Sequence, residues 1–216
     1  MRAVLIAAKQ LALAKTRLMA VLPSVSERSS LAEAMFRDVL NAAFSARSPE
    51  RVTVVTNDPQ LIRLAQSEGA MVINEEYPRG LNAAVRLATM QLAAAGMTCI
   101  CTLLSDIPLV TGEDIDAAFA GMPGDEQAVS VVPSRDFSGT NIIVRRPPEV
   151  IVTQFGRQSL VRHLEDCRQR RIACQVARLE RPALDIDVPA DLQEFERRHS
   201  LTHTQAHLER LSLVHN

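Results

Sequence analysis

TCICTLLSDIPL, residues 98–109, indicates the class of the fold. The apolar run Thr98–Leu104 has the length of a buried strand, and it ends at Ser105 and Asp106. Pro108 stiffens the turn that follows the carboxylate. Ligands of open α/β sheets bind beside the carboxyl ends of the strands, so we expect Asp106 to lie at a ligand-binding edge. A strand-end Asp is also common as a turn or capping residue.

The residues around this stretch alternate between short apolar runs and amphipathic helical segments. Strand followed by helix repeats about four times before Pro133, which predicts a mostly parallel mixed sheet covered by helices on both faces. The predicted strands are Ala3–Ala8, Arg51–Thr56, Ala70–Asn74, Thr98–Leu104, Gln127–Val132, Thr140–Val144 and Ala173–Ala177. The predicted helices are Glu27–Ala46 with Ser26 as cap, Pro59–Glu68 with a cap in Asn57-Asp58, Leu81–Ala95, Gly112–Ala120, Ser159–Arg171 and Pro189–Arg198.

The composition fits one α/β domain with an aliphatic core. The chain has 216 residues, of which 47% are hydrophobic and only 3% aromatic. We expect a domain over residues 1–199 and a C-terminal tail over residues 200–216, with a helix at Thr202–Val214. The 24 basic and 25 acidic residues leave a net charge of −1. That balance argues against duplex nucleic acid as the main partner.

Cysteine use and hydropathy point to the cytoplasm. Cys99 and Cys101 share one face of a predicted strand, and the zinc-knuckle spacing is absent, so we interpret the four cysteines as buried free thiols. Free thiols are typical of a reducing compartment. Lys9 interrupts the apolar N-terminal stretch, which therefore has the length of a strand. No run of about 18 apolar residues is present, so no membrane span is expected.

Acidic residues gather where the predicted strands end. Asp185 and Asp187 face the same way in an extended chain, within about 7 Å, and two such carboxylates repel unless a cation lies between them. Mg²⁺ prefers carboxylates together with water and phosphate oxygens, so Asp106, Asp185 and Asp187 are candidate Mg²⁺ ligands. Alternatively, Asp187 only caps the helix at Pro189. The other polar residues at strand ends are Lys9, Thr56-Asn57-Asp58, Glu75-Glu76 and Ser134-Arg135.

Basic residues follow the first predicted strand. Lys9, Lys15 and Arg17 are placed to meet phosphate oxygens, although a solvated surface cluster is the alternative. The loop lacks the Gly-rich pattern of P-loop nucleotidases, and the chain lacks the Gly-x-Gly-x-x-Gly pattern of nicotinamide-binding folds. The chain is therefore not expected to be a P-loop NTPase, and a nicotinamide-binding fold is disfavoured.

Three polar turns complete the candidate site. Gly80 permits close backbone approach and Asn82 offers both a donor and an acceptor, so a nucleobase or ribose can lie there; helix capping is the alternative. The turns Ser138–Asn141 and Phe155–Ser159 are candidates for holding an anionic group, the second because it leads into a helix N-terminus. Ordinary turn chemistry is the alternative for both.

Taken in order, several short motifs resemble the guanylyltransferases of deazaflavin-coenzyme biosynthesis. The resemblance covers residues 1 to about 195. It departs at Ala7-Ala8, where the family usually has Pro-Val, and at Ser105, where Ala is common. The motifs are Lys9-Gln10-Leu11 with Ala14–Leu18, Gly80–Ala84, Asp106–Leu109, Gly139-Thr140-Asn141, Phe155-Gly156 with Ser159 and His163, and Asp185-Ile186-Asp187.

The resemblance implies a nucleotide-diphospho-sugar-transferase-like fold (Rossmann-like) and a reaction. GMP from GTP would join the phosphate of 2-phospho-L-lactate, phosphoenolpyruvate or 3-phosphoglycerate, with release of pyrophosphate, on the path to coenzyme F-420 and its downstream transferase. By resemblance, the metal ligands would be Asp106, Asp185 and Asp187, with Mg²⁺ as the cofactor. GTP would contact Lys9, Lys15, Arg17, Gly80 and Asn82, with Lys15 also catalytic. The phospho-acid would contact Thr140, Gly156 and Ser159.

Two alternative functions would also use a nucleotide site. The acceptor could be a sugar phosphate or a molybdopterin, although those enzymes usually show a Gly-rich first loop. Alternatively, the chain could be a nucleotide-binding module without catalysis, in which the aspartates are structural. The sequence leaves open the choice among the three acids and the oligomeric state, a homodimer included.

Overall fold

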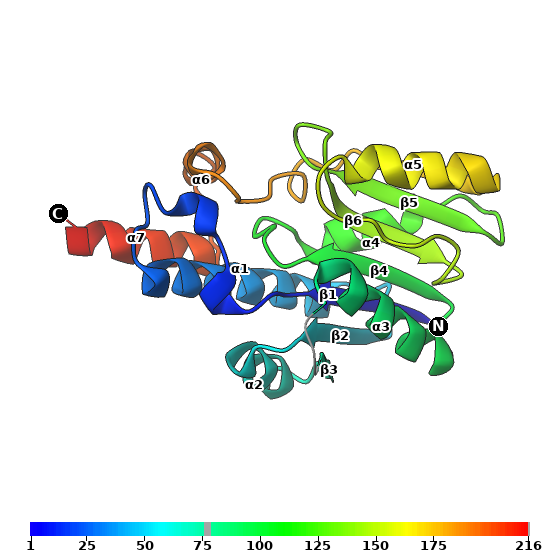
Figure 1. Ribbon diagram of the computed structural model, residues 1–216, viewed down its shortest axis with the longest axis horizontal. Coiled ribbons are helices and arrows are strands. Elements are labelled where there is room, and N and C mark those ends of the chain that lie inside the picture. The colour runs from blue at the N-terminus through cyan, green and yellow to red at the C-terminus, as the bar shows by residue number, and fades with distance from the viewer. Residues whose placement is uncertain (76–78, 216) are drawn as a thin grey trace.

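The computed structural model describes residues 1–75 and 79–215 and contains a seven-stranded sheet with helices on both faces (Figure 1). Glu75 lies among the described residues and Glu76 outside them. The strands are β1 (Arg2–Ala7), β2 (Arg51–Thr56), β3 (Met71–Asn74), β4 (Cys99–Leu104), β5 (Ala128–Pro133), β6 (Thr140–Arg146) and β7 (Ala173–Val176). The helices are α1 (Val25–Ser45), α2 (Pro59–Ser67), α3 (Leu81–Ala94), α4 (Gly112–Ala120), α5 (Ser159–Arg170), α6 (Pro189–Glu196) and α7 (His203–His215), with 3₁₀ turns η1 (Leu11–Leu13) and η2 (Thr16–Leu18).

The strand order is β3-β2-β1-β4-β6-β5-β7. Among the described strands, β6 alone runs against its neighbours β4 and β5. The other pairs are parallel, as short apolar strands joined by helices require. The predicted fold class is confirmed, and most predicted elements are displaced by only a residue or two at their ends.

Two hydrophobic clusters fill the space on either side of the sheet. Along β1, Val4 and Ile6 face the cluster that contains residues of α1, α2, α4, α6 and α7. Leu5 faces the opposite cluster, built with residues of α3 and α5. Side chains alternate across a strand, so a strand such as β1, which is apolar from Ala3 to Ala7, requires helices on both faces. Among the described helices, none is both long and apolar enough to cross a bilayer.

Helix α1 begins earlier than predicted. Its N-cap is Ser24, whose Oγ accepts from the N–H of Ser26 at 3.1 Å. The carboxylate of Glu27 accepts from the N–H of Ser24 at 3.3 Å and completes a capping box. The expected cap at Ser26 is wrong because Ser24 has the Glu three residues downstream that the box requires.

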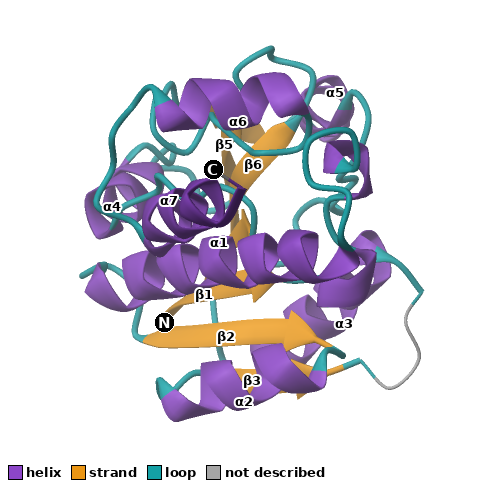
Figure 2. Ribbon diagram, turned by 90° about the vertical axis from the view of Figure 1, so that its left-hand side faces the viewer, coloured by secondary structure: helices purple, strands orange, loops and turns teal. Residues whose placement is uncertain are grey.

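Helix α7 crosses and packs against α1 on one face of the molecule (Figure 2). The buried carboxylate of Asp38 on α1 accepts from the N–H groups of His203 and Thr204, at 2.7 and 2.9 Å, and from the Thr204 hydroxyl. A side chain of one helix thus caps the N-terminus of another. The four cysteines are free thiols; three are buried and Cys174 is half-buried.

Candidate active site

The loop after β1 is fixed by a carboxylate from a neighbouring element. Asp58, the N-cap of α2, accepts from the N–H groups of Gln60 and Leu61 at 2.8 and 3.1 Å. Its second oxygen accepts from the N–H of Leu11 at 2.9 Å. The predicted cap at Asp58 therefore also holds the loop that carries the basic residues.

Lys15 reaches from this loop into the edge of the sheet. Its Nζ lies 2.7 Å from Oδ2 of Asp106 and 2.9 Å from Oδ1 of Asp187, and its side chain is 7% exposed. Burial alone lowers the pKa of Lys15, but the charges and hydrogen bonds of the two carboxylates outweigh burial and raise the pKa overall. The backbone of Lys15 is left-handed, with φ of 54°. A non-glycine residue in this conformation costs on the order of 1–3 kcal/mol, and such strain gathers at functional sites.

Backbone and side-chain contacts bring the late acidic segment to the end of β4. The N–H of Ile186 donates to the carbonyl of Asp106 at 3.0 Å. Asn141, the second residue of β6, donates to Oδ1 of Asp185 at 3.1 Å and to the carbonyl of Pro182 at 3.0 Å. Asp106, Asp185 and Asp187 therefore lie together at the carboxyl edge of the parallel strands, although β4 and the late segment are far apart in sequence.

The three carboxylates have unequal surroundings. Burial raises the pKa of Asp185 to about 6, and the charges of Asp106 and Asp187 add to the rise, although a hydrogen bond from Asn141 opposes it. Burial also acts to raise the pKa of Asp187, but the Lys15 ammonium outweighs it and the pKa is lowered. Lys9 and Arg17 also lower it through their charges, and Arg17 lies 3.7 Å from Asp187. All three predicted phosphate-binding residues therefore act on one acidic cluster.

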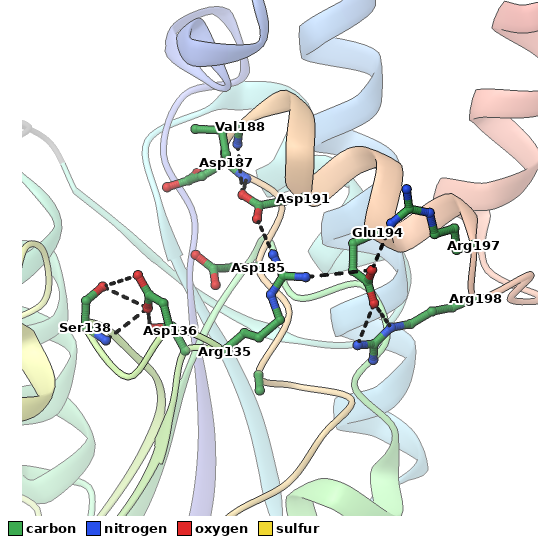
Figure 3. Close-up of polar contacts among 12 residues, drawn as sticks. Arg135, Asp136, Ser138, Asp185, Asp187, Val188, Asp191, Glu194, Arg197 and Arg198 are labelled. Carbon is green, nitrogen blue, oxygen red and sulfur yellow. Dashed lines mark hydrogen bonds and ion pairs between the residues drawn. The ribbon is translucent and has the colours of Figure 1, made fainter.

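Asp191 performs the capping that the sequence offered as an alternative role for Asp187. Its Oδ2 accepts from the N–H groups of Asp187 and Val188, at 3.1 and 3.0 Å, at the start of α6 (Figure 3). The guanidinium of Arg135 binds its other oxygen at 3.3 Å. With α6 capped by Asp191, the carboxylate of Asp187 is left to bind Lys15.

The residues expected to contact the acceptor lie at the start of β6 and before α5. Thr140 is 2% exposed and Ser159, the first residue of α5, is 1% exposed. Gly156 has φ of 116°, a conformation that side-chain-bearing residues avoid. Asn141, the residue after Thr140, binds Asp185, whereas the Thr140 hydroxyl lies against His163 of α5.

Asn82 is engaged with the protein's own backbone. Its Oδ1 accepts from the N–H of Phe155 at 2.7 Å and its Nδ2 donates to the carbonyl of Phe155 at 3.0 Å. Gly80, with φ of 93°, is the N-cap of α3 and lets the chain turn into that helix. These bonds join the start of α3 to the segment before Gly156; contact of Asn82 with a nucleoside stays a prediction.

The acidic cluster has donor atoms that suit a hard cation. Oδ1 of Asp106 is buried and has no hydrogen-bond partner among the described residues. A buried carboxylate oxygen without a donor is costly and is suited to a cation. Among the described residues, no group of three or more His, Cys, Asp and Glu side chains is arranged to enclose a metal ion as it stands. The Lys15 ammonium lies between two of the three carboxylates and supplies positive charge there.

Comparison with known proteins defines the family. Residues 1–215 match the family described as "Guanylyl transferase CofC like". The chain belongs to the CofC-like guanylyltransferase family. Its sequence is 34% identical, over 87% of this chain and 88% of the relative, to the phosphoenolpyruvate guanylyltransferase of Sphaerobacter thermophilus. It is 38% identical, over 85% and 84%, to the 3-phospho-D-glycerate guanylyltransferase of Phenylobacterium zucineum. It is 32% identical, over 92% and 85%, to the 2-phospho-L-lactate guanylyltransferase of Methanothermobacter thermautotrophicus.

Solved structures share the fold of this CofC-like chain at low sequence identity. A Desulfovibrio desulfuricans G20 protein assigned to the nucleotide-diphospho-sugar transferases has a TM-score of 0.77 at 18% identity, covering 98% of this chain and 95% of that one. A cytidylyltransferase from Leptospira borgpetersenii has a TM-score of 0.64 at 13% identity, covering 99% and 93%. The fold and the family inferred from the motifs are therefore confirmed.

Three residues of this CofC-like site have contacts that the sequence did not predict. Asn141 and His163 stand within quoted motifs, yet only the structure shows that Asn141 binds Asp185 and that His163 binds Thr140. Asp191 could have been recognised as a cap because it follows Val188 by three residues, the spacing of a capping box.

Proposed function

We propose that the chain transfers GMP from GTP to the phosphate of a small phospho-acid and releases pyrophosphate. The candidate acceptors are phosphoenolpyruvate, 2-phospho-L-lactate and 3-phosphoglycerate, which are the acids in the names of its relatives. One observation carries the proposal. Lys15 bridges Asp106 and Asp187 beside Asp185, at the sheet edge where nucleotides bind in this class of fold.

The chemistry is an in-line displacement at the α-phosphorus of GTP. A phosphate oxygen of the acid attacks, a new phosphoanhydride bond forms, and the bond to the β-phosphate breaks with its electron pair leaving on pyrophosphate. The attacking oxygen is already anionic near neutral pH, so no general base is required. Catalysis then depends on positioning two anions and neutralising their charge.

Cationic side chains of the first loop would supply part of that neutralisation. Lys15 carries a buried ammonium, while Lys9 and Arg17 are exposed and act on the same acidic cluster. We assign all three to the phosphates of GTP, where Arg offers a planar fork and Lys a point charge. This arrangement favours departure of pyrophosphate.

Asp106, Asp185 and Asp187 are the residues that would hold Mg²⁺. The unpartnered Oδ1 of Asp106 and the raised pKa of Asp185, about 6, are consistent with carboxylates that gain from a cation. A bound Mg²⁺ supplies Lewis acidity and draws the two substrate anions together. The protein's own part is to fix the carboxylates through Asn141, Asp191 and the backbone of Ile186.

The acid is assigned to the region between β6 and α5. Thr140, Gly156 and Ser159 are its proposed contacts, and the N–H groups at the start of α5 favour an anionic group. We place the activity in the cytoplasm, with the product passing to a transferase that consumes it.

Pyrophosphate release tests the proposal against the other acceptor classes. The chain is incubated with Mg²⁺, with each of GTP, ATP, CTP and UTP in turn, and with each of the three acids, a hexose 1-phosphate or no acceptor. We expect release that requires GTP and one of the acids. Release with the sugar phosphate would instead favour a sugar-nucleotide enzyme, and Mg²⁺-dependent GTP binding without release would favour a module without catalysis.

A further inference from the structure

His163 on α5 has both ring nitrogens bound inside the protein. It is 0% exposed. Its Nε2 accepts from the backbone N–H of Gln154 at 2.8 Å, and its Nδ1 lies 3.1 Å from Oγ1 of Thr140. A backbone N–H can only donate, so Nε2 carries no proton. In the neutral ring the proton is therefore on Nδ1, which donates to the Thr140 hydroxyl.

The imidazole is neutral near pH 7. Burial lowers the pKa of His163 to about 4, and the charges of Arg145 and Arg162 add to that shift, against a small opposing effect of Asp166. The tautomer is therefore set by the contact with Gln154, because the charged form, in which both nitrogens are donors, is excluded.

The tautomer of His163 determines which hydrogen bonds the Thr140 hydroxyl can make. Its oxygen accepts from His163, and its own proton has no hydrogen-bond acceptor among the described residues. Thr140 is 2% exposed, and a buried hydroxyl proton without an acceptor is costly. An anionic ligand oxygen would satisfy it. The next residue, Asn141, binds Asp185, so residues 140 and 141 link α5 to the segment that carries the acidic cluster.

The same imidazole helps to fix the backbone before Gly156. The carbonyl of Gln154 accepts from Arg162 at 2.9 Å, while its N–H donates to His163. Both polar groups of Phe155 are bound by Asn82. The Phe155 ring also packs edge-on against the His163 ring, with centroids 5.7 Å apart. Three side chains thus hold all four polar backbone groups of this dipeptide.

We propose that His163 is a positioning residue for the phospho-acid. It holds the Thr140 hydroxyl as a donor toward an anionic oxygen of the acid, and it holds the Gln154–Phe155 backbone that leads to Gly156. The inference rests on the proposed function and deepens it, because it assigns recognition of the acceptor's anionic oxygen to a tautomer fixed by the fold.

Paired substitutions separate this role from a structural one. His163→Gln places a carbonyl oxygen near the position of Nε2 but loses the donor to Thr140, whereas His163→Asn keeps an amide nitrogen near Nδ1. Thr140→Val removes the hydroxyl at nearly constant volume. We expect His163→Gln and Thr140→Val each to raise the KM of the acid about tenfold, the effect of one hydrogen bond, with the KM of GTP unchanged. His163→Asn should raise it less.

The double variant tests whether the two residues act through one contact. If they do, adding His163→Gln to Thr140→Val raises the KM of the acid no further. The proposal would be overturned if the two single-variant increases in the KM of the acid multiply in the double variant. Equal rises in the KM of GTP and of the acid would also overturn it.

A spectroscopic readout tests the tautomer without turnover. In ¹⁵N-histidine-labelled protein, the signal that His163→Gln removes is that of His163, one of five histidines. At pH 7 and at pH 6 we expect a protonated Nδ1 and a bare Nε2. A protonated Nε2 would overturn the proposal even in an active enzyme. Failure of the wild-type chain to use any acid would instead contradict the proposed function.

Discussion

The ammonium of Lys15 lies 2.7 Å from a carboxylate oxygen of Asp106, although 91 positions separate the two residues in sequence. Asp187 accepts from the same ammonium at 2.9 Å. This contact joins three segments: the loop after β1, the end of β4 and the turn before α6. It places the buried ammonium of Lys15 where the proposed reaction would bring phosphate and metal charge together.

Replacing Asp187 by Asn keeps the shape of the side chain and removes its charge. We expect turnover to fall at least about 100-fold, in the range seen when an electrostatic contact to a transition state is removed. The fold should persist because Asp191, rather than Asp187, caps α6. Initial rates of pyrophosphate release and a thermal melt measure both. The matched control is Asp125→Asn, an exposed site; wild-type-like turnover in Asp187→Asn would refute the assigned role.

Lys15→Met removes the positive charge between the carboxylates. The acidic cluster should then bind a divalent ion more tightly in the absence of nucleotide, by about tenfold or more, because the competing ammonium is gone. Titration with Mn²⁺, followed by calorimetry, measures this affinity, and turnover with GTP should fall in the same variant. Arg47→Met is the control, since Arg47 is exposed and lies before β2, at the opposite edge of the sheet. Unchanged or weaker Mn²⁺ binding by Lys15→Met would contradict the account.

Asn82→Ala breaks two hydrogen bonds to the backbone of Phe155. The free energy of unfolding should fall by about 1–3 kcal/mol, and the KM of the acid should rise more than that of GTP. Denaturant titration and initial rates test both, with Gln91→Ala on the exposed face of α3 as the control. A rise confined to GTP would show that Asn82 serves the nucleoside instead.

The buried His163 predicts acid sensitivity. Because burial and nearby arginines hold its pKa at about 4 instead of 6.5, the unfolded chain takes up a proton first as the pH falls. The contribution of neutral His163 to the free energy of unfolding is therefore fully present above pH 6.5 and is lost progressively toward pH 4. The loss between pH 7 and pH 5 is about 2 kcal/mol. Urea titrations at both pH values should show that His163→Gln lacks this part of the loss. The control variant His199→Gln, at an exposed position, should show the same loss of unfolding free energy as the wild type. Equal losses in the wild type and in His163→Gln would exclude His163 as the source.

The fold was predictable because its signals are local and repeated. Apart from Arg2 and Thr102, the β1 and β4 segments are apolar, and buried parallel strands need that pattern. Asp58 followed by Pro59 predicted a helix start, which the structure confirms. The prediction of Ser26 as the N-cap of α1 was wrong because Ser24 and Ser26 both offer a hydroxyl, and only the spacing to Glu27 distinguishes them.

The candidate site was predictable only in outline. Ligands at strand ends follow from topology, so Asp106 could be placed at an edge without coordinates. The pairing of Lys15 with that carboxylate depends on a left-handed backbone at a lysine, which sequence does not signal. The bonds of Asn82 to Phe155 and of His163 to Thr140 join residues far apart in the chain, and they depend on how α3, α5 and β6 pack.

Transfer of label from the α-phosphate of GTP follows the proposed reaction itself. The wild-type chain is incubated with α-³²P-labelled GTP, Mg²⁺ and each of the three acids, and the products are separated. We expect label to appear in a diphosphate-linked guanosine adduct of one or more acids, in equal amount to released pyrophosphate, and we expect Asp187→Asn to form almost none. Label that stays in GTP with every acid, or passes only to free GMP, would contradict it.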